Sequence, residues 1–285
     1  MAASSGSMED LRVLTEIVKG FHAPLVGGSD GTNIREANPF NNDQLKTNDA
    51  STSYAYASVD RAIELLRDPD LIEHNLAAMP GITNESLTTK LIRTCEDRSD
   101  SLAIIDLPDV YVPSSEQRCD TFAKKIKTTP RQAAQKLVNR QLNSSYGATY
   151  YPWVKIRDEQ SSRDVWVPPS VVALGVMAFT EERDDVWFAP AGFNRGGLNA
   201  GNAGVPVLQV SEQLLSKDRD TLYEANINPI ASFVSEGLVV FGQKTLQSTQ
   251  SALDRINVRR LLIFVKKFVQ VCFLSRMFKR LGITL

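Results

Sequence analysis

Residues Leu102–Leu107 read LAIIDL, a nearly continuous apolar run with one acid near its end. Such runs are typical of strands in parallel sheets, which are buried on both faces. The preceding segment predicts a second strand at His74–Met79, a turn at Pro80-Gly81 and a helix at Glu85–Glu96. A strand, a helix and a strand in this order form a βαβ unit, with a right-handed crossover as the default. We therefore expect an α/β fold with a mixed, partly parallel sheet covered by helices.

A second stretch, Tyr146–Gly197, contains all three tryptophans of the chain, Trp153, Trp166 and Trp187. Each lies beside a proline or an apolar run, and such aromatic and β-branched segments are typical of buried strands separated by turns. Pro169 follows another proline and suits the first position of a helix. The helix that it opens is apolar on most sides, so we expect it to be buried.

The remaining elements follow from periodicity and turn signals. Helices are predicted at Glu9–Lys19, Val59–Arg67, Ser114–Thr128, Pro130–Leu142, Ser170–Thr180, Ser211–Ala225 and Leu253–Lys267, and strands at Ala23–Val26, Val205–Val210 and Gly237–Gly242. Residues 29–53, rich in Asn, Asp, Ser and Thr, predict a long polar loop. We divide the chain into residues 1–7, a cloning scar or disordered leader, an α/β portion at 8–145, and a C-terminal portion at 146–285 packed on the same core.

The composition is that of an ordinary globular protein. The 285 residues include 42% hydrophobic and 23% charged ones, and the net charge is -1, which does not favour a nucleic-acid partner. The three cysteines, Cys95, Cys119 and Cys272, are too far apart for a zinc motif and indicate a reducing compartment.

The charge is unevenly distributed along the chain. Residues 255–285 contain eight basic residues and no acid, which leaves the first 254 residues with a net charge of -9. A basic end on an acidic body indicates an interaction segment. The candidate assembly contacts are Arg259, Arg260, Lys266 and Lys267.

Helical spacing predicts which side of this segment is buried. Leu261, Val265, Phe268 and Cys272 recur every three to four residues, so we expect this stripe to face inward. Arg259, Lys266 and Lys267 would then lie nearer the surface. An equally weighted alternative is that Arg259 or Arg260 pairs with an acid of its own domain, because buried arginines need partners.

Gly27–Gly31 fits the nucleophile-elbow pattern G-x-S-x-G, and a serine hydrolase with Ser29 as its nucleophile is an alternative function. That motif needs a strand before the serine and a helix after it, and here a polar loop follows, which favours a plain glycine-rich turn. The segment GFNRGGLNAGNAG lacks the G-K-[ST] and the helix of a phosphate-binding loop and predicts a surface loop. The two histidines, His22 and His74, show no ligand spacing. We nominate no catalytic, cofactor-binding or metal-binding residue.

The last 25 residues combine apolar runs with basic residues. Lys266-Lys267 interrupts these runs, which fall short of the roughly 20 residues that a membrane span requires. A basic amphipathic helix of this kind fits a membrane-surface or peptide-binding module. A helix packed on its own domain is the favoured interpretation.

Several phrases of the sequence occur together in a known family. They are GGSDG, LAAMPGIT with LAIIDLP, WVPPS with VWFAPAG and NRG, LSKDRDTLYEANINPI, GLVVFGQKTL and DRINVRRL. In this order they resemble tail sheath proteins of contractile-tailed bacteriophages of the myovirus type. The resemblance covers roughly Pro24 to Lys267, and several motifs in a fixed order are more specific than one short pattern.

The resemblance implies a structural subunit, not an enzyme. Such subunits stack in rings around a tail tube, and the sheath contracts by rearrangement of subunits to drive the tube into the host envelope. The implied partners are copies of the chain itself, the tail tube protein, and baseplate and tail terminator proteins, with no direct nucleic acid, no membrane insertion and no cofactor. The implied location is the virion tail sheath, and the host cytoplasm during assembly. A related contractile injection device fits the same motifs.

The resemblance fades after Lys267, where family members continue for many more residues, and we interpret residues 268–285 as an altered or out-of-frame ending. Family members carry extended arms at both ends that add strands to neighbouring subunits. We expect this chain to be a fragment or a truncated version that, without those arms, stays monomeric or associates weakly.

Overall fold

The computed structural model describes residues 40, 42, 45, 53–108, 110–111, 128–158, 160–199 and 201–280, with side chains as far as Phe273. The chain divides into two compact units, Met1–Glu36 and Ala37–Leu285, and every described residue belongs to the second. Several predicted features lie wholly or almost wholly outside the described residues: the helices at Glu9–Lys19 and Ser114–Thr128, the strand at Ala23–Val26, the turn at Gly27–Gly31, and His22.

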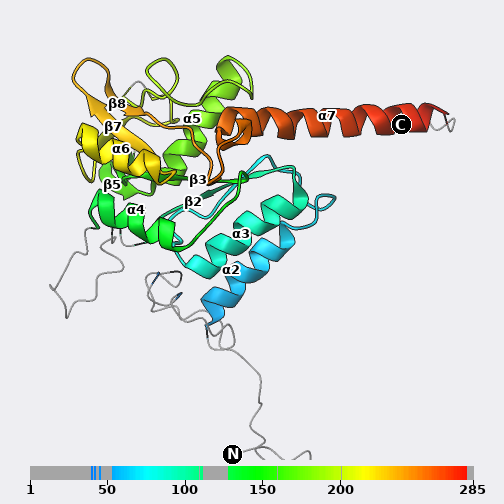
Figure 1. The fold of residues 1–285 in the computed structure, drawn as a ribbon, viewed down its shortest axis with the longest axis horizontal. Coiled ribbons are helices and arrows are strands. Elements are labelled where there is room, and N and C mark those ends of the chain that lie inside the picture. The colour runs from blue at the N-terminus through cyan, green and yellow to red at the C-terminus, as the bar shows by residue number, and fades with distance from the viewer. Residues whose placement is uncertain are drawn as a thin grey trace, which may run out of the picture. The chain divides into compact units, whose positions relative to one another are not determined.

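A five-stranded sheet forms the centre of the second unit (Figure 1). Its strand order is β1-β2-β3-β7-β8, with bounds Leu76–Ala78, Leu102–Ile105, Gly147–Tyr151, Asn228–Phe233 and Gly237–Val240. The pairs from β1 to β7 are parallel, and β8 runs antiparallel to β7. The predicted mixed, partly parallel sheet is confirmed, as is the βαβ unit, since β1 and β2 are parallel neighbours joined by a helix.

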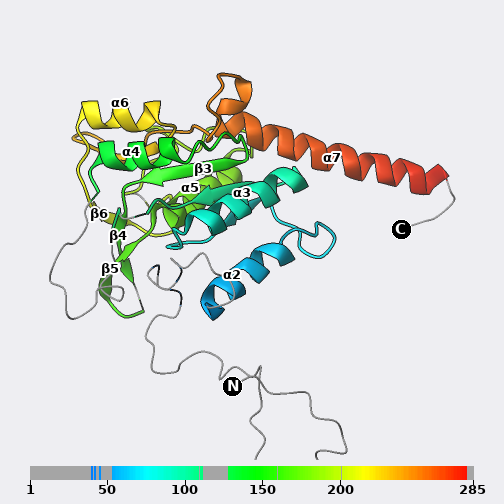
Figure 2. The same ribbon diagram turned by 60° about the horizontal axis from the view of Figure 1, so that its bottom comes forward.

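Helices cover both faces of this sheet (Figures 1 and 2). Side chains of β2 alternate between two cores: Ala103 and Ile105 pack with α2, α3 and α4, whereas Leu102 and Ile104 pack with α5 and the start of α7. The LAII run is therefore apolar because both of its faces are buried. The helices are α2 Tyr54–Leu65, α3 Glu85–Arg98, α4 Pro130–Asn139, α5 Pro169–Arg183, α6 Ser216–Glu224, the short η3 Ala252–Asp254, and α7 Ile256–Arg280.

The tryptophan-rich stretch forms strands, helix α5 and turns. A second, antiparallel sheet has the order β5-β4-β6, from Arg163–Val167, Val154–Asp158 and Val207–Val210. Trp153 and Trp166 pack against Tyr111, with ring centroids 5.0 and 5.3 Å apart. The predicted strand around Trp187 is wrong, because α5 runs on to Arg183 and Trp187 lies in the turn that follows it. Trp187 is 37% exposed, and the centroid of its ring lies 5.6 Å from that of Phe264 on α7.

Some boundaries differ from the prediction. Residues 211–215 precede α6 and are not part of it, because the Ser211 N–H donates to the Trp153 carbonyl at 2.8 Å. Strand β7 was not predicted, since a proline at its second position argues against a central strand. The loop at GFNRGG is not simply a surface loop: Leu198 is fully buried, and the segment exchanges backbone hydrogen bonds with β8 through Gly196 and Leu198. It thereby covers the edge of β8.

Two buried polar side chains hold loops to the sheet. Asp106, just after β2, accepts a hydrogen bond from the Gly81 N–H at 2.9 Å and from both the hydroxyl and the N–H of Ser170 in the first turn of α5. Asn228 of β7 donates to the carbonyls of Thr149 and Lys244, and its amide oxygen accepts from the Lys244 N–H at 2.6 Å. The NINPI and GQKT phrases of the sequence are thus in direct contact.

Candidate assembly site at helix α7

All four predicted contact residues lie on α7, the helix that begins at Ile256. Its inward face is formed by Ile256, Arg260, Ile263 and Lys267, which follow one another at spacings of four, three and four residues. The first three of these side chains are buried, and the fourth is partly buried. This mixed face, not an apolar stripe, is how α7 packs on its own domain.

The predicted inward stripe is wrong. Leu261, Val265 and Phe268 are 36%, 42% and 60% exposed, and Cys272 is exposed as well. The physical reason is that α7 continues past the sheet, as both ribbon views show, so that its later turns meet no other described element (Figures 1 and 2). The apolar side chains do recur at a helical spacing, but the side of α7 that faces the domain carries Arg260 and Lys267.

Arg260 is held by a carboxylate of α5. Its guanidinium donates to Glu181 at 2.7 Å, and the arginine side chain is 2% exposed while the glutamate remains 42% exposed. Burial lowers the pKa of Arg260, and the neighbouring Glu181 opposes that shift. The alternative in which Arg259 or Arg260 pairs with an acid of its own domain is thus realised by Arg260.

Arg259 is buried without a carboxylate partner among the described residues. Its guanidinium carbon lies 4.0 Å from the centre of the Tyr146 ring, and it donates a hydrogen bond to the Ser145 hydroxyl. The side chain is 5% exposed, which contradicts the expected position near the surface. A cation over the electron-rich face of an aromatic ring is stabilised most when both are desolvated, so Tyr146 serves as the main partner.

Lys266 is the most open of the four. It is exposed, and its ammonium lies 3.3 Å from the Tyr146 hydroxyl and 5.9 Å from the ring centre. A lysine in this position keeps its charge available to a neighbouring molecule at little desolvation cost.

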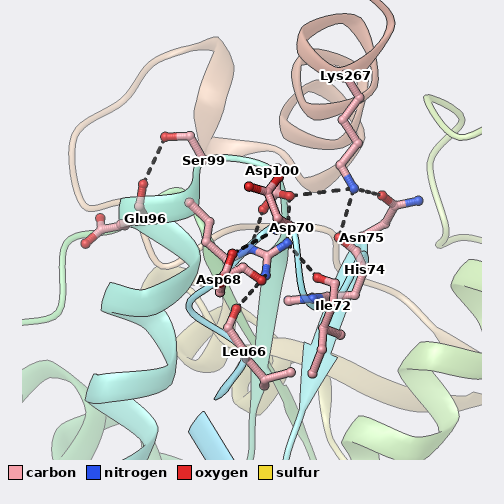
Figure 3. Close-up of polar contacts among 11 residues, drawn as sticks. Leu66, Asp68, Asp70, Ile72, His74, Asn75, Glu96, Ser99, Asp100 and Lys267 are labelled. Atoms are coloured by element: carbon pink, nitrogen blue, oxygen red, sulfur yellow. Dashed lines mark hydrogen bonds and ion pairs between the residues drawn. The ribbon is translucent and has the colours of Figure 1, made fainter. Parts of the chain in front are cut away.

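Lys267 points from α7 onto the start of β1 (Figure 3). Its ammonium donates to the His74 carbonyl at 2.9 Å and to the Asn75 side-chain oxygen at 2.6 Å, and lies 3.8 Å from the Asp100 carboxylate. Burial alone would raise the pKa of Asp100, but the hydrogen bonds from Arg98 and the charge of Lys267 hold it below its ordinary value.

Arg98 joins this contact to the segment before β1. Its guanidinium binds both Asp100 oxygens, at 2.8 and 2.9 Å, and donates to the carbonyls of Leu66, Asp68 and Ile72. The two buried ring nitrogens of His74 lie beside this cluster, and neither has a hydrogen-bond partner among the residues that the structure describes. Burial, and next the charge of Arg98, lower the pKa of His74, so the ring is neutral near pH 7. The arginine and aspartate were not predicted as part of the site, and only their proximity in space reveals them.

Other kinds of site find little support in the described part of the chain. A cleft of about 950 Å³ lies between the ends of α4 and α6 and residues 243–255, with Tyr223, Lys244 and Arg255 in its wall. The Lys244 ammonium lies 4.2 Å from the Tyr223 ring centre, which engages the cation internally. Among the described residues no group of three His, Cys, Asp or Glu side chains is arranged to hold a metal ion. No helix in the described ranges is both long and apolar enough to cross a bilayer.

Comparison with known proteins supports the resemblance. A scan against protein-family models gives no match. A segment of 122 residues, 43% of this chain, is 37% identical to the tail sheath protein of Vibrio phage KVP40, and covers 17% of that protein. A segment of 128 residues, 45% of this chain, is 33% identical to the tail sheath protein of Enterobacteria phage T4, and covers 18% of it. The matched part of the chain is homologous to phage tail sheath proteins, which confirms the resemblance.

The fold is shared with a solved sheath. Over 74% of this chain and 50% of the other, the structure superposes with a TM-score of 0.53 and 22% identity on the sheath complex of an extracellular contractile injection system, PVC, in its contracted state. This likeness concerns the fold alone. The alignments with the curated relatives span less than one fifth of the length of those proteins.

Proposed function

We propose that this chain is a structural subunit of a contractile tail sheath, which stacks in rings around a tail tube and contracts by rearrangement between two subunit packings. The observation that carries the proposal is the 37% identity to a phage tail sheath protein over 122 residues. The shared α/β fold supports it. Copies of the chain, the tube protein, and baseplate and terminator proteins are the proposed partners, in the virion tail and, during assembly, in the host cytoplasm.

The proposed role involves no catalysis, no nucleic acid and no membrane insertion. The relatives are named for a structural role, and the proposed contraction is a rearrangement of subunits that requires no bond cleavage. Ser29, which lies outside the described residues, is the one candidate nucleophile of the sequence. Ester hydrolysis by the purified chain that disappears in Ser29→Ala would contradict a purely structural role.

The four basic residues of α7 serve assembly in two ways under this proposal. Arg259, Arg260 and Lys267 fix the orientation of α7 through contacts within the chain, and Lys266 offers its charge to a neighbouring copy. A net charge of -9 over residues 1–254 gives that lysine an oppositely charged partner surface on the next subunit.

Self-association of the full chain tests the proposal. Sedimentation velocity over a range of concentration and salt, with electron microscopy at the highest concentration, should show reversible association that weakens as salt screens the charges. Lys266→Glu should weaken it, and Arg131→Glu, an exposed change on α4, should not. We expect this association to be weak, in line with the sequence analysis, and equal association of the Lys266→Glu and Arg131→Glu variants would count against the proposed role of Lys266.

A further inference from the structure

An exposed group of aromatic side chains lies where α6, β7 and β8 meet. Phe193, Phe233 and Phe241 form a triangle with ring centroids 5.1, 5.2 and 6.0 Å apart. The guanidinium of Arg219 lies 5.1 Å from the Phe233 ring and 6.0 Å from the Phe241 ring. We call these four residues the aromatic patch. Phe193 and Phe241 remain 50% and 44% exposed, and the adjacent Val234 is fully exposed.

The patch is more than scattered surface hydrophobicity. Single exposed apolar residues are ordinary, but here three rings come together from different segments of the chain. Aromatic residues and arginine are the side chains enriched at protein interfaces and at their energetic centres. The patch therefore has the composition of a docking surface for an apolar partner.

The later turns of α7 carry exposed apolar side chains that complement the aromatic patch. Phe268, Val269, Val271 and Phe273 are 60%, 56%, 65% and 65% exposed. A helix that is apolar around most of its circumference is normally buried, because each such side chain gains free energy on leaving water. In Figures 1 and 2, α7 extends away from α6, so α7 does not cover the patch of its own copy.

Charge decides between the partners that α7 can take. Residues 255–285 carry eight basic residues and no acid, so two α7 helices side by side would repel one another. Residues 211–236, which contain α6 and most of the strand and turn around the patch, carry five acids and two bases. The basic segment that contains the helix is thus opposite in net charge to the segment that carries most of the patch.

We propose that the part of α7 that follows Lys267 docks on the aromatic patch of a second copy of this chain. This inference rests on the proposed function and specifies one of its contacts. The two surfaces differ and lie at different ends of one unit, so the contact is head-to-tail. Repetition of such a contact produces rings or helical filaments and not closed dimers.

Site-directed cross-linking tests this contact. Cys272 is an exposed native thiol on α7, Cys95 is buried, and Cys119 is first replaced by serine. In that background Val234→Cys places a second exposed thiol beside the patch. A short bis-maleimide should join Cys272 of one copy to the new thiol of the next and yield dimers and higher ladders, identified by peptide mass spectrometry.

Matched variants make the result specific. Val138→Cys puts a thiol at a position of α4 that is 54% exposed and should yield no such ladder, and Cys272→Ser should abolish it. Adding Phe241→Ser should lower the yield on the order of tenfold, the effect of one lost interface side chain, with circular dichroism unchanged. Three outcomes would overturn the proposal. The first is cross-links only between two Cys272 thiols, and the second is equal yields from both introduced thiols. The third is protection of Cys272 by anionic vesicles and not by a second copy.

The cross-links and the sedimentation experiment separate the two proposals. Self-association that persists at full strength in Phe241→Ser, without cross-links at the patch, would place the contact elsewhere and leave the sheath role standing. Absence of cross-links at the patch would overturn this contact, whereas the sheath role, for which weak association is expected, does not depend on it.

Discussion

Arg260 of α7 donates to the carboxylate of Glu181 on α5 across 2.7 Å, and this contact ties the C-terminal helix to the buried helix behind the sheet. The Arg260 side chain is 2% exposed, so removal of the glutamate leaves a buried guanidinium without its carboxylate partner. A buried charge without its partner is costly, although the half-open position of Glu181 admits water.

We predict that Glu181→Ala lowers the free energy of unfolding by about 2 kcal/mol, the range for a hydrogen bond to a charged group. The measurement is urea denaturation followed by circular dichroism. Glu182→Ala, the exposed neighbour, is the control and should change stability by less than about 0.5 kcal/mol. Equal effects of the two changes would show that the pair contributes nothing.

Asp106 makes stability depend on pH. Burial raises its pKa from 3.8 to about 6, against the opposing hydrogen bonds from Gly81 and Ser170. The folded chain therefore binds this proton more tightly than the unfolded chain. The contribution of Asp106 to stability is greatest below about pH 4, falls as the pH rises to about 6, and stays constant above that.

The test compares the native chain with Asp106→Asn. The unfolding free energy of the native chain relative to the variant should fall by about 2 kcal/mol between pH 4 and pH 7, since one unit of pKa corresponds to about 1.4 kcal/mol and part of the change lies below pH 4. Carboxyls with lowered pKa, such as Asp100, make stability rise with pH, but they are present in both chains. The difference in unfolding free energy between the native chain and the variant therefore reports Asp106 alone. A difference that is flat with pH would contradict the prediction.

Gly175 allows α5 to approach a loop closely. A Cβ at this position would lie 2.1 Å from the Ala203 carbonyl oxygen, which is far inside contact distance. Helix propensity predicts that alanine is better than glycine by up to about 1 kcal/mol. We expect the opposite: Gly175→Ala should destabilise by about 2 kcal/mol or more through overpacking.

The control is the reverse change at Ala178, an exposed residue three positions later in α5, where only helix propensity is affected. Ala178→Gly should cost about 1 kcal/mol in thermal or urea unfolding. If Gly175→Ala proved stabilising, the close approach of α5 to Ala203 would be refuted.

Asn228 satisfies backbone groups of two other segments at once. Asn228→Ala would leave the carbonyls of Thr149 and Lys244 and the Lys244 N–H without this partner in a buried place. We predict a loss of about 3 kcal/mol, the cost of several unsatisfied buried groups partly relieved by water. Asn228→Asp should be worse at neutral pH, because a carboxylate would face two carbonyl oxygens. If the aspartate variant were as stable as the native chain, this account would be contradicted.

The periodicity of the sequence determined most of the central sheet and its covering helices. LAIIDL reads as a doubly buried strand because each alternate side chain meets a different core, and Pro169 opens α5 because a proline loses no helical hydrogen bond there. The homology to sheath proteins was also visible in the order of short phrases. Neither inference needed coordinates, since local propensity and burial agreed at these positions.

Only the tertiary structure decided how α7 is used. From spacing alone, the apolar stripe at Leu261 and Phe268 should be buried, yet Arg260 and Lys267 occupy the inward face and the apolar residues are exposed. Periodicity records which residues share a side of a helix, but it does not record which side has a neighbour. That depends on carboxylates and carbonyls brought from residues far away in the chain, such as Glu181 and His74. Likewise, Phe193 joins Phe233 and Phe241 in one patch only because the loop at Gly196 runs along β8.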